Sequence, residues 1–123
     1  MIYGIGIDLV KKSRVSRAFK RFGDRFILRV LTEREWLLCQ KKGDSIGSIA
    51  ARIAAKEAVF KALGTGWAKG IGWHDVEVLN DSQGKPLIRL YGEVGRRTKG
   101  LQLHLSISHE RESAIAFAVI EEL

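Results

Sequence analysis

Four charged residues on one helical stretch have the types and spacing for phosphate chemistry. Residues 45–63 read SIGSIAARIAAKEAVFKAL and include Arg52, Lys56, Glu57 and Lys61. Arg52 and Lys56 lie four residues apart on the apolar arc, where like charges repel and burial adds a desolvation cost. An anion held between them would relieve both penalties. In the alternative interpretation, their aliphatic stems cover the core while their charges reach water.

Two carboxylates in the chain are candidate metal ligands. Residues 2–9 alternate in character, which predicts a strand with one face formed by Gly4, Gly6 and Asp8. Glycines in a strand often mark the close approach of a ligand or of another backbone. Asp8 and Glu57 would together suit Mg²⁺, which is usually held by one or two carboxylates plus phosphate oxygens and waters. A surface ion pair with Lys61 is the competing interpretation of Glu57.

A third group of polar residues follows an alternating run near the end of the chain. Leucine and isoleucine at 101, 103, 105 and 107 alternate with polar residues, which predicts a half-buried strand. His104 lies on the polar face of this strand, where it would act as a base or donor near a phosphate, or be an ordinary exposed histidine. The sequence contains none of the G-x-S-x-G, Walker A, G-x-G-x-x-G, C-x-x-C or H-E-x-x-H motifs.

The elements that would position these residues can be predicted from caps and periodicity. A helix is expected over 13–22, with Ser13 as its N-cap and Gly23 after its end, followed by a short helical segment from Asp24. Thr32-Glu33-Arg34-Glu35 has the form of a capping box, so another helix should start at Thr32 and stop near Gly43. Asp44 or Ser45 caps the long helix over 45–63, and Gly64 ends it.

The last third of the chain is expected to contain mostly strands. Strands are predicted around 76–78 and over 87–91 with a turn between them, and a short helix over 92–99. The alternating run from 101 and the apolar run 113–120 should form a hairpin. Several strands follow one another here, more than a regular alternation of strands and helices would give. This indicates an α+β fold with an antiparallel sheet packed against the long central helix. At 123 residues, the chain is expected to form one compact domain over 1–123.

The net charge of the chain comes from one stretch, residues 11–34, which we call the basic segment. The chain has 21 Lys and Arg against 14 Asp and Glu, a formal charge of +7. The basic segment holds nine of the cations and two of the acids, so the remaining 12 cations and 12 acids balance. Such a patch predicts an acidic partner: a nucleic acid, an anionic membrane or an acidic protein.

Several classes are excluded by composition. The apolar runs are much shorter than the ~18 residues that a membrane span needs. The first residues, MIYGIGIDLV, lack the basic region and cleavage site of a signal peptide, so a cytoplasmic location is expected. The single cysteine, Cys39, excludes an intramolecular disulfide and is interpreted as a core residue.

Taken together, these motifs resemble the holo-[acyl carrier protein] synthases, the small 4′-phosphopantetheinyl transferases. The resemblance covers the whole chain, and the central motif is its most specific part. It rests on GIGIDLV at 4–10 followed by Arg14, FILRVLTEREW at 26–36, RIAAKEAVFKALGTG at 52–66, GKP at 84–86 and LHLSISH at 103–109. Ile53 departs from the aromatic residue that the family pattern suggests, which concerns packing and not the charged positions.

The resemblance implies a magnesium-dependent transferase that supports fatty acid synthesis. Such enzymes move 4′-phosphopantetheine from coenzyme A to a serine of acyl carrier protein and release adenosine 3′,5′-bisphosphate. By similarity, Asp8 and Glu57 would bind the metal and Lys61 would meet the pyrophosphate. The base for the serine would be Glu57, through a metal-bound water, or His104 directly. Residues expected to contact coenzyme A are Arg52, Lys56, Gly64, Thr65, Gly66, Ser108 and His109.

The resemblance also implies partners. By similarity to the family, the chain would form a homotrimer with active sites shared between subunits. Acyl carrier protein is strongly acidic, and it would dock on Arg14, Arg17, Arg21 and Arg25. A nucleic-acid-binding module that uses the same basic segment is the alternative. The nucleic-acid alternative leaves Asp8, Glu57 and His104 without a role, so it ranks below the transferase. We expect no nucleic acid and no membrane among the partners.

Overall fold

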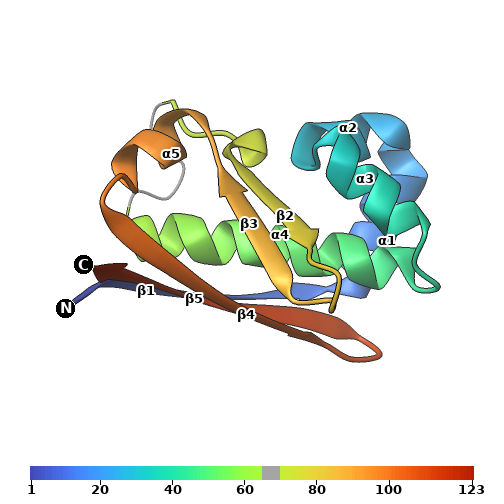
Figure 1. Ribbon diagram of the computed structural model, residues 1–123. Helices are drawn as coiled ribbons and strands as arrows, with labels where there is room; N and C mark the ends of the chain where they lie inside the picture. The colour runs from blue at the N-terminus through green and yellow to red at the C-terminus, as the bar shows by residue number, and fades with distance from the viewer. Residues whose placement is uncertain (65–69) are drawn as a thin grey trace.

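A long helix, α4 (Ser45–Leu63), forms the centre of the protein in the computed structural model, which describes residues 1–64 and 70–123. Its sequence is rich in alanine, the strongest helix former, and it begins at Asp44, whose carboxylate accepts from the backbone N–H of Gly47 at 2.8 Å. Gly64 ends it in the left-handed conformation with φ of 76°. These caps confirm the predicted bounds, and Figure 1 shows the helix running through the middle of the molecule.

A three-stranded antiparallel sheet covers one side of α4. It consists of β1 (Ile2–Lys11), β5 (Ser113–Glu122) and β4 (Leu101–His109), in the order β1-β5-β4. Every second residue of β5 faces α4, and all four of these side chains are buried: Ala114, Ala116, Ala118 and Ile120. Small residues on this face let the sheet lie close to the helix.

A second, two-stranded sheet lies on the other side of α4. It is the hairpin of β2 (Val76–Asn80) and β3 (Pro86–Leu90), preceded by a short 3₁₀ turn, η1 (Trp73–Asp75), and followed by α5 (Gly92–Arg97). In Figure 1 this hairpin crosses in front of α4. Val76 and Val78 of β2 pack in the same core as α4. The expected α+β fold is therefore confirmed, with the antiparallel strands divided between two sheets.

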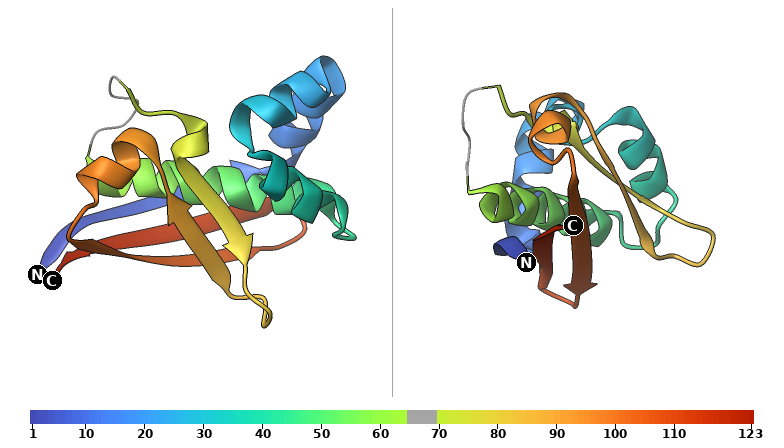
Figure 2. Two further views of the ribbon diagram at one scale, coloured as in Figure 1. Left: turned by 45° about the horizontal axis from the view of Figure 1, so that its top comes forward. Right: turned by 60° about the vertical axis from the view of Figure 1, so that its left-hand side comes forward.

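Three short helices form a group near the N-terminal end of α4. They are α1 (Lys12–Phe22), α2 (Asp24–Val30) and α3 (Glu33–Gln40), which project together from the body in Figure 2. The capping box at Thr32 is present, as predicted. The prediction of Ser13 as a cap is wrong, because β1 continues to Lys11 and α1 begins at Lys12 without a side-chain cap. Gly23, with φ of 61°, makes the turn between α1 and α2.

The core confirms the interpretation of the single cysteine. Cys39 is fully buried among apolar residues of α2, α3 and α4, and burial raises the pKa of its thiol. Ser48 donates to its sulfur at 3.3 Å. Within residues 1–64 and 70–123, no helix combines the length and apolar character that crossing a membrane requires.

Candidate active site

Two glycines of β1 bring the backbone of this strand directly against α4. A Cβ atom built on Gly4 would lie 1.8 Å from the carbonyl oxygen of Ala62, and one on Gly6 would lie 1.9 Å from that of Ala58. No side chain fits in this space, so the glycines allow the approach of another backbone, one of the two predicted uses. Alternation along β1 then places Asp8 on the same face, toward the preceding turn of the helix, which carries Glu57.

Asp8 lies at an ionic cluster with two residues of α4. The Nζ of Lys61 donates to Oδ1 of Asp8 at 3.1 Å and to the carbonyl oxygen of Ile7 at 3.0 Å. Among the described residues, the ion pair of Lys61 is therefore with Asp8 and not with Glu57. This corrects the alternative in which Glu57 merely pairs with Lys61 along the helix.

The carboxyl group of Glu57 is in an unfavourable place for a negative charge. Its pKa is raised, first by burial and then by the nearby charge of Asp8, while Lys61 partly opposes the shift. Two neighbouring carboxylates repel each other in this way unless a cation lies between them. The electrostatics thus favour a cation at this position.

The fit of a divalent metal can be judged from the donor set. In the described parts of the chain, no group of three or more His, Cys, Asp or Glu side chains is arranged to hold a metal ion. Asp8 and Glu57 supply only two carboxylates, which is few for zinc or calcium. It is the usual number for Mg²⁺, which takes its remaining ligands from waters and substrate phosphates. The pair therefore fits Mg²⁺ bound together with a phosphate substrate.

A hollow of about 390 Å³ connects this cluster to the basic segment. Its walls come from β1, α1, α2 and α4, and its lining residues are Asp8, Leu9, Val10, Arg14, Val15, Ala18, Phe26, Ile53 and Glu57. The two candidate metal ligands and one candidate docking arginine thus face one cavity. Apolar side chains from α1 and α2 complete it.

The arginines of the predicted docking surface lie in α1 and α2. Arg14, Arg17, Arg21 and Arg25 are all exposed. The guanidinium of Arg21 lies 5.2 Å from the ring centre of Phe22, a cation–π contact. These positive charges are accessible to an acidic partner beside the hollow.

Lys56 has a different environment from the one expected. It is fully buried, and its Nζ donates to Oε1 of Glu35 at 2.7 Å and to the carbonyl oxygens of Val30 at 2.8 Å and Trp73 at 3.0 Å. All three of its N–H groups therefore have protein acceptors. The prediction that Lys56 contacts coenzyme A is corrected, as is the snorkelling alternative, because the charge lies in the interior.

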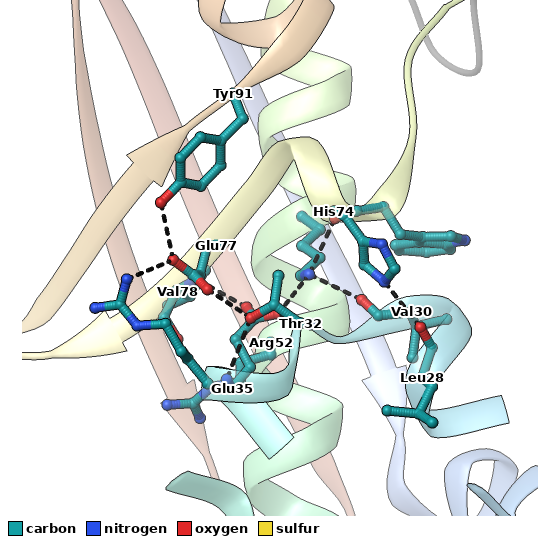
Figure 3. Close-up of polar contacts among 12 residues, drawn as sticks. Leu28, Val30, Thr32, Glu35, Arg52, His74, Glu77, Val78 and Tyr91 are labelled. Atoms are coloured by element: carbon teal, nitrogen blue, oxygen red, sulfur yellow. Dashed lines mark hydrogen bonds and ion pairs between the residues drawn. The ribbon is translucent and has the colours of Figure 1, made fainter. Parts of the chain in front are cut away.

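The acceptor of Lys56 belongs to a larger buried network between α3 and β2, shown in Figure 3. Glu35 also accepts from the backbone N–H groups of Thr32 and Val78, both at 2.8 Å. Glu77 accepts from the hydroxyl groups of Thr32 at 2.6 Å and Tyr91 at 3.1 Å. Sequence reasoning missed both glutamates as core residues, although the capping box pointed to Glu35.

Arg52 is also nearly buried, but it borders a second hollow of about 420 Å³. Its guanidinium donates to the carbonyl oxygen of Val78, to Oδ1 of Asn80 and to Ser48. His109, which was also predicted to contact coenzyme A, lines the same hollow. The other lining residues are Lys42, Gly43, Asp44, Ser48, Ala51, Val78, Asn80, Gly84, Pro86 and Ile107. Of these, Gly84 and Pro86 could have been found from the GKP motif.

His104 is not near the carboxylates within this chain. It is opposite Val119 in the β4–β5 ladder, and Val119 is opposite Ile5, all on the outer face of the sheet. Asp8 is opposite Ala116 on the inner face, which packs on α4. His104 pairs instead with Glu121 at 2.9 Å. The prediction of His104 as a base in the same site is therefore corrected for a single subunit.

Four further residues were predicted to contact coenzyme A. Ser108 lies on the outer face, because it is opposite Ile115. Gly64 is the C-cap of α4, one turn beyond Lys61. Thr65 and Gly66 lie outside the described residues.

Comparison with known proteins gives consistent results for the whole chain. A family model described as the 4′-phosphopantetheinyl transferase superfamily matches residues 4–118. A protein of Chlorobaculum tepidum named holo-[acyl-carrier-protein] synthase is 46% identical over 117 residues, which cover 95% of this chain and 97% of that relative.

Two crystal structures of proteins with this name share the fold. The Neisseria meningitidis structure is 36% identical, with a TM-score of 0.90, and the match covers 99% of this chain and 100% of that one. The Bacillus anthracis structure, described as in complex with CoA (3′,5′-ADP), is 38% identical, with a TM-score of 0.84 over 100% of this chain and 99% of that one.

Proposed function

Because the chain belongs to the 4′-phosphopantetheinyl transferase superfamily, we propose that it transfers 4′-phosphopantetheine from coenzyme A to a serine of apo acyl carrier protein, releasing adenosine 3′,5′-bisphosphate. The observation that carries this function is the cluster of Asp8, Glu57 and Lys61, whose two carboxylates line a hollow that also contains Arg14. Phosphoryl transfer needs concentrated positive charge and accurate positioning more than covalent chemistry.

In this proposal, Asp8 and Glu57 hold Mg²⁺. The bound metal would supply positive charge to the pyrophosphate of coenzyme A. Lys61 is half-exposed, so its ammonium can turn from Asp8 toward a phosphate oxygen. Glu57 is the carboxylate positioned to receive the proton of the serine hydroxyl, since His104 lies on the opposite face of the sheet.

The second hollow is the proposed place for the nucleotide end of coenzyme A. Arg52 and Lys42 give it positive charge, which suits a phosphate, His109 adds an imidazole that can hydrogen-bond, and the hairpin residues Gly84 and Pro86 close one side. The two hollows share α4, with Arg52 and Ile53 facing one each. A coenzyme A molecule that reaches from one to the other would bring its pyrophosphate toward Lys61.

The partner that the basic segment fits is acyl carrier protein. Arg14 lines the hollow that contains the carboxylates, and the other exposed arginines lie on α1 and α2, which form part of its wall, so a docked acidic protein would present its serine there. A nucleic acid would bind the same charges but would leave the cluster of Asp8, Glu57 and Lys61 without a role.

The outer face of the three-stranded sheet supports the proposed homotrimer. Ile5, Ile7 and Leu9 of β1 are each more than half exposed, at 56%, 53% and 57%. In register with them on β5 lie Phe117, exposed by 42%, and Ile115, exposed by 37%. An exposed apolar patch of this kind marks an interface, and further copies of this chain are the proposed occupants. His104 and Ser108 border this patch, so they would lie at the subunit boundary.

Transfer can be tested directly by mass spectrometry. Apo acyl carrier protein, incubated with the enzyme, coenzyme A and Mg²⁺, should gain the mass of one phosphopantetheine group. No gain would reject the proposed function, and binding to duplex DNA that falls steeply with salt would then favour the nucleic-acid alternative.

The docking surface and the assembly each need their own measurement. Arg14→Glu combined with Arg21→Glu should raise KM for the carrier protein and leave KM for coenzyme A little changed, whereas Lys99→Glu, an exposed cation far from α1, should change neither.

Sedimentation should give three times the chain mass of 13.8 kDa for the wild type and a smaller species for Phe117→Asp. The cytoplasmic location stays a prediction.

A further inference from the structure

The helix α2 is attached to the body of the protein through its last carbonyl groups. The Nζ of Lys56 donates to the carbonyl oxygen of Val30 at 2.8 Å. The Nε2 of His74, in η1, lies 2.8 Å from the carbonyl oxygen of Leu28, and Nε2 must be the donor because a carbonyl only accepts. Figure 3 shows His74 beside Leu28, with Val30 next to them. We call these two contacts the α2 clamp.

The clamp matters because α2 has little stability of its own. It is seven residues long, and its N-cap, Gly23, makes no side-chain hydrogen bond. Isolated helices shorter than about 12 residues are marginal in water. The final carbonyls of any helix lack partners within it, and here cationic or N–H side chains from α4 and η1 supply them.

What α2 carries connects the clamp to the site. Arg25 and Arg29 are exposed on its outside, and Phe26 lines the hollow that contains Glu57. Lys56 directly precedes Glu57 in α4, so the clamp and the carboxylate belong to the same rigid helix. A shift of α2 away from Lys56 would therefore be a shift of the docking arginines relative to the reacting groups.

The buried charge of Lys56 is costly, which suggests a purpose beyond packing. Burial lowers the pKa of Lys56, and the charge of Glu35 opposes this effect. An apolar residue of similar size often gives a core at least as stable as a buried ion pair does. Lys56 instead gathers Val30 of α2, Glu35 of α3 and Trp73 of η1 at one atom. An apolar side chain could not fix the relative positions of these three elements with this directionality.

We propose that Lys56 and His74 are positioning residues that hold α2 in register with α4, so that a docked carrier protein presents its serine to the Asp8–Glu57 pair. This inference rests on the proposed transferase function for its kinetic consequences. The clamp itself is a property of the structure and can be tested without any turnover.

The first test uses His74, which is exposed and can be changed without opening the core. His74→Leu should raise KM for the carrier protein about three- to tenfold, the range expected for one lost hydrogen bond. It should leave KM for coenzyme A unchanged. His74→Gln should restore the wild-type value, because the glutamine amide can donate to the same carbonyl group. Thr98→Val, which removes a hydroxyl bonded to the last carbonyls of α5, is the matched control and should change neither KM.

The second test uses Lys56→Met, which keeps the volume and removes the charge. We expect a larger rise of the carrier KM, roughly ten- to a hundredfold, because a buried charged hydrogen bond is lost. Glu35 would keep its two backbone donors, Thr32 and Val78, which limits the penalty of its unpaired charge. If this variant does not fold, the two His74 variants decide the question alone.

Hydrogen exchange separates the clamp from the proposed function. Amide exchange over residues 24–31 should become faster in His74→Leu and Lys56→Met, and stay at the wild-type rate in His74→Gln and Thr98→Val. Unchanged exchange over α2 in His74→Leu would overturn the proposal, as would faster exchange with an unchanged carrier KM or an equal rise of both KM values. Absence of transfer by the wild type would reject the function, and the exchange result would then still decide whether the clamp exists.

Discussion

On one face of α4, Arg52 and Lys56 are almost completely buried and donate to protein acceptors, whereas on the face that meets β1, Glu57 and Lys61 remain partly exposed around Asp8. Within each pair, the two residues lie four positions apart in the sequence of α4. The difference lies in how far protein groups already satisfy the charges. Lys56 donates to Glu35 and two carbonyl groups, and Arg52 donates to uncharged acceptors, so both cations hold elements together. Asp8 and Glu57 instead set two carboxylates against Lys61, which leaves negative charge for a cation.

The largest expected effect tests the exposed face. Glu57→Gln should lower turnover by more than about a hundredfold, because it removes one of two metal-binding carboxylates and the proposed proton acceptor. The free energy of unfolding should stay the same or rise, since the charge of Glu57 is disfavoured in the folded protein. Steady-state kinetics at saturating Mg²⁺ and urea denaturation measure the two quantities.

The control for this variant is Glu112→Gln, an exposed carboxylate between β4 and β5 that should leave both quantities unchanged. Wild-type turnover by Glu57→Gln would show that the assignment of the exposed face to chemistry is wrong.

The buried face should show the reverse pattern. Glu35→Ala leaves the charge of Lys56 buried without its carboxylate, which should cost about 3–5 kcal/mol in the free energy of unfolding. Glu33→Ala, an exposed neighbour in the same helical turn, should cost less than about 1 kcal/mol. Urea denaturation at pH 7 compares them. Equal costs would mean that the buried ion pair does not hold α3 and α4 together.

A smaller effect is expected where the exposed face is built. Gly6→Ala places a Cβ atom 1.9 Å from the carbonyl oxygen of Ala58, so β1 must move away from α4. Overpacking of this kind costs about 1–3 kcal/mol, and it should also lower turnover because Asp8 moves with the strand. Gly43→Ala, which has open space around the new methyl group, is the control in thermal melts and assays. A fully active, stable Gly6→Ala protein would disconnect this contact from the site.

The smallest effect concerns the ion pair of Lys12 and Asp44 at the start of α4, where the side chain of Asp44 is half-exposed. The hydrogen bond from Lys12 is the main cause of the lowered pKa of Asp44. Its stabilising contribution should therefore be complete above the unfolded pKa of about 4 and disappear as the pH falls through the lower folded value. Asp44→Asn keeps a capping side chain and should cost less than about 1 kcal/mol at pH 7.

The check is urea denaturation of both proteins between pH 7 and about pH 3, over which the difference should become smaller as Asp44 is protonated. A difference that is constant with pH would mean that the charge of Asp44 contributes nothing, unlike the charges on either face of the helix.

Local features of the fold could be predicted from the sequence, whereas partners distant along the chain could not. The capping box at Thr32 and the ends of α4 depend on residues within one turn, so their patterns were sufficient. The environment of Lys56 depends on Glu35, 21 residues away, and that of Lys61 on Asp8, 53 residues away. Helical spacing alone does not distinguish the buried Lys56 from the half-exposed Lys61.

The same limit explains the misplacement of His104. Alternation along β4 correctly separated its two faces, but it did not indicate which face would pack on α4 together with Asp8. That choice depends on the order β1-β5-β4 and on the register of both ladders, and the β1–β5 ladder joins residues more than 100 positions apart. The family resemblance named the residues of the site, and the structure showed which of them lie together.

The contact of the two glycines with the backbone of α4 has a consequence for heating. Side chains that position a reacting group usually loosen with temperature before the protein unfolds, because their rotamers become populated. Here the distance between the strand of Asp8 and the helix of Glu57 is set by main-chain atoms, with no side chain between them at Gly4 and Gly6. The backbones that carry the two carboxylates can separate only when β1 leaves the core. Loss of activity on warming should therefore coincide with cooperative melting instead of preceding it.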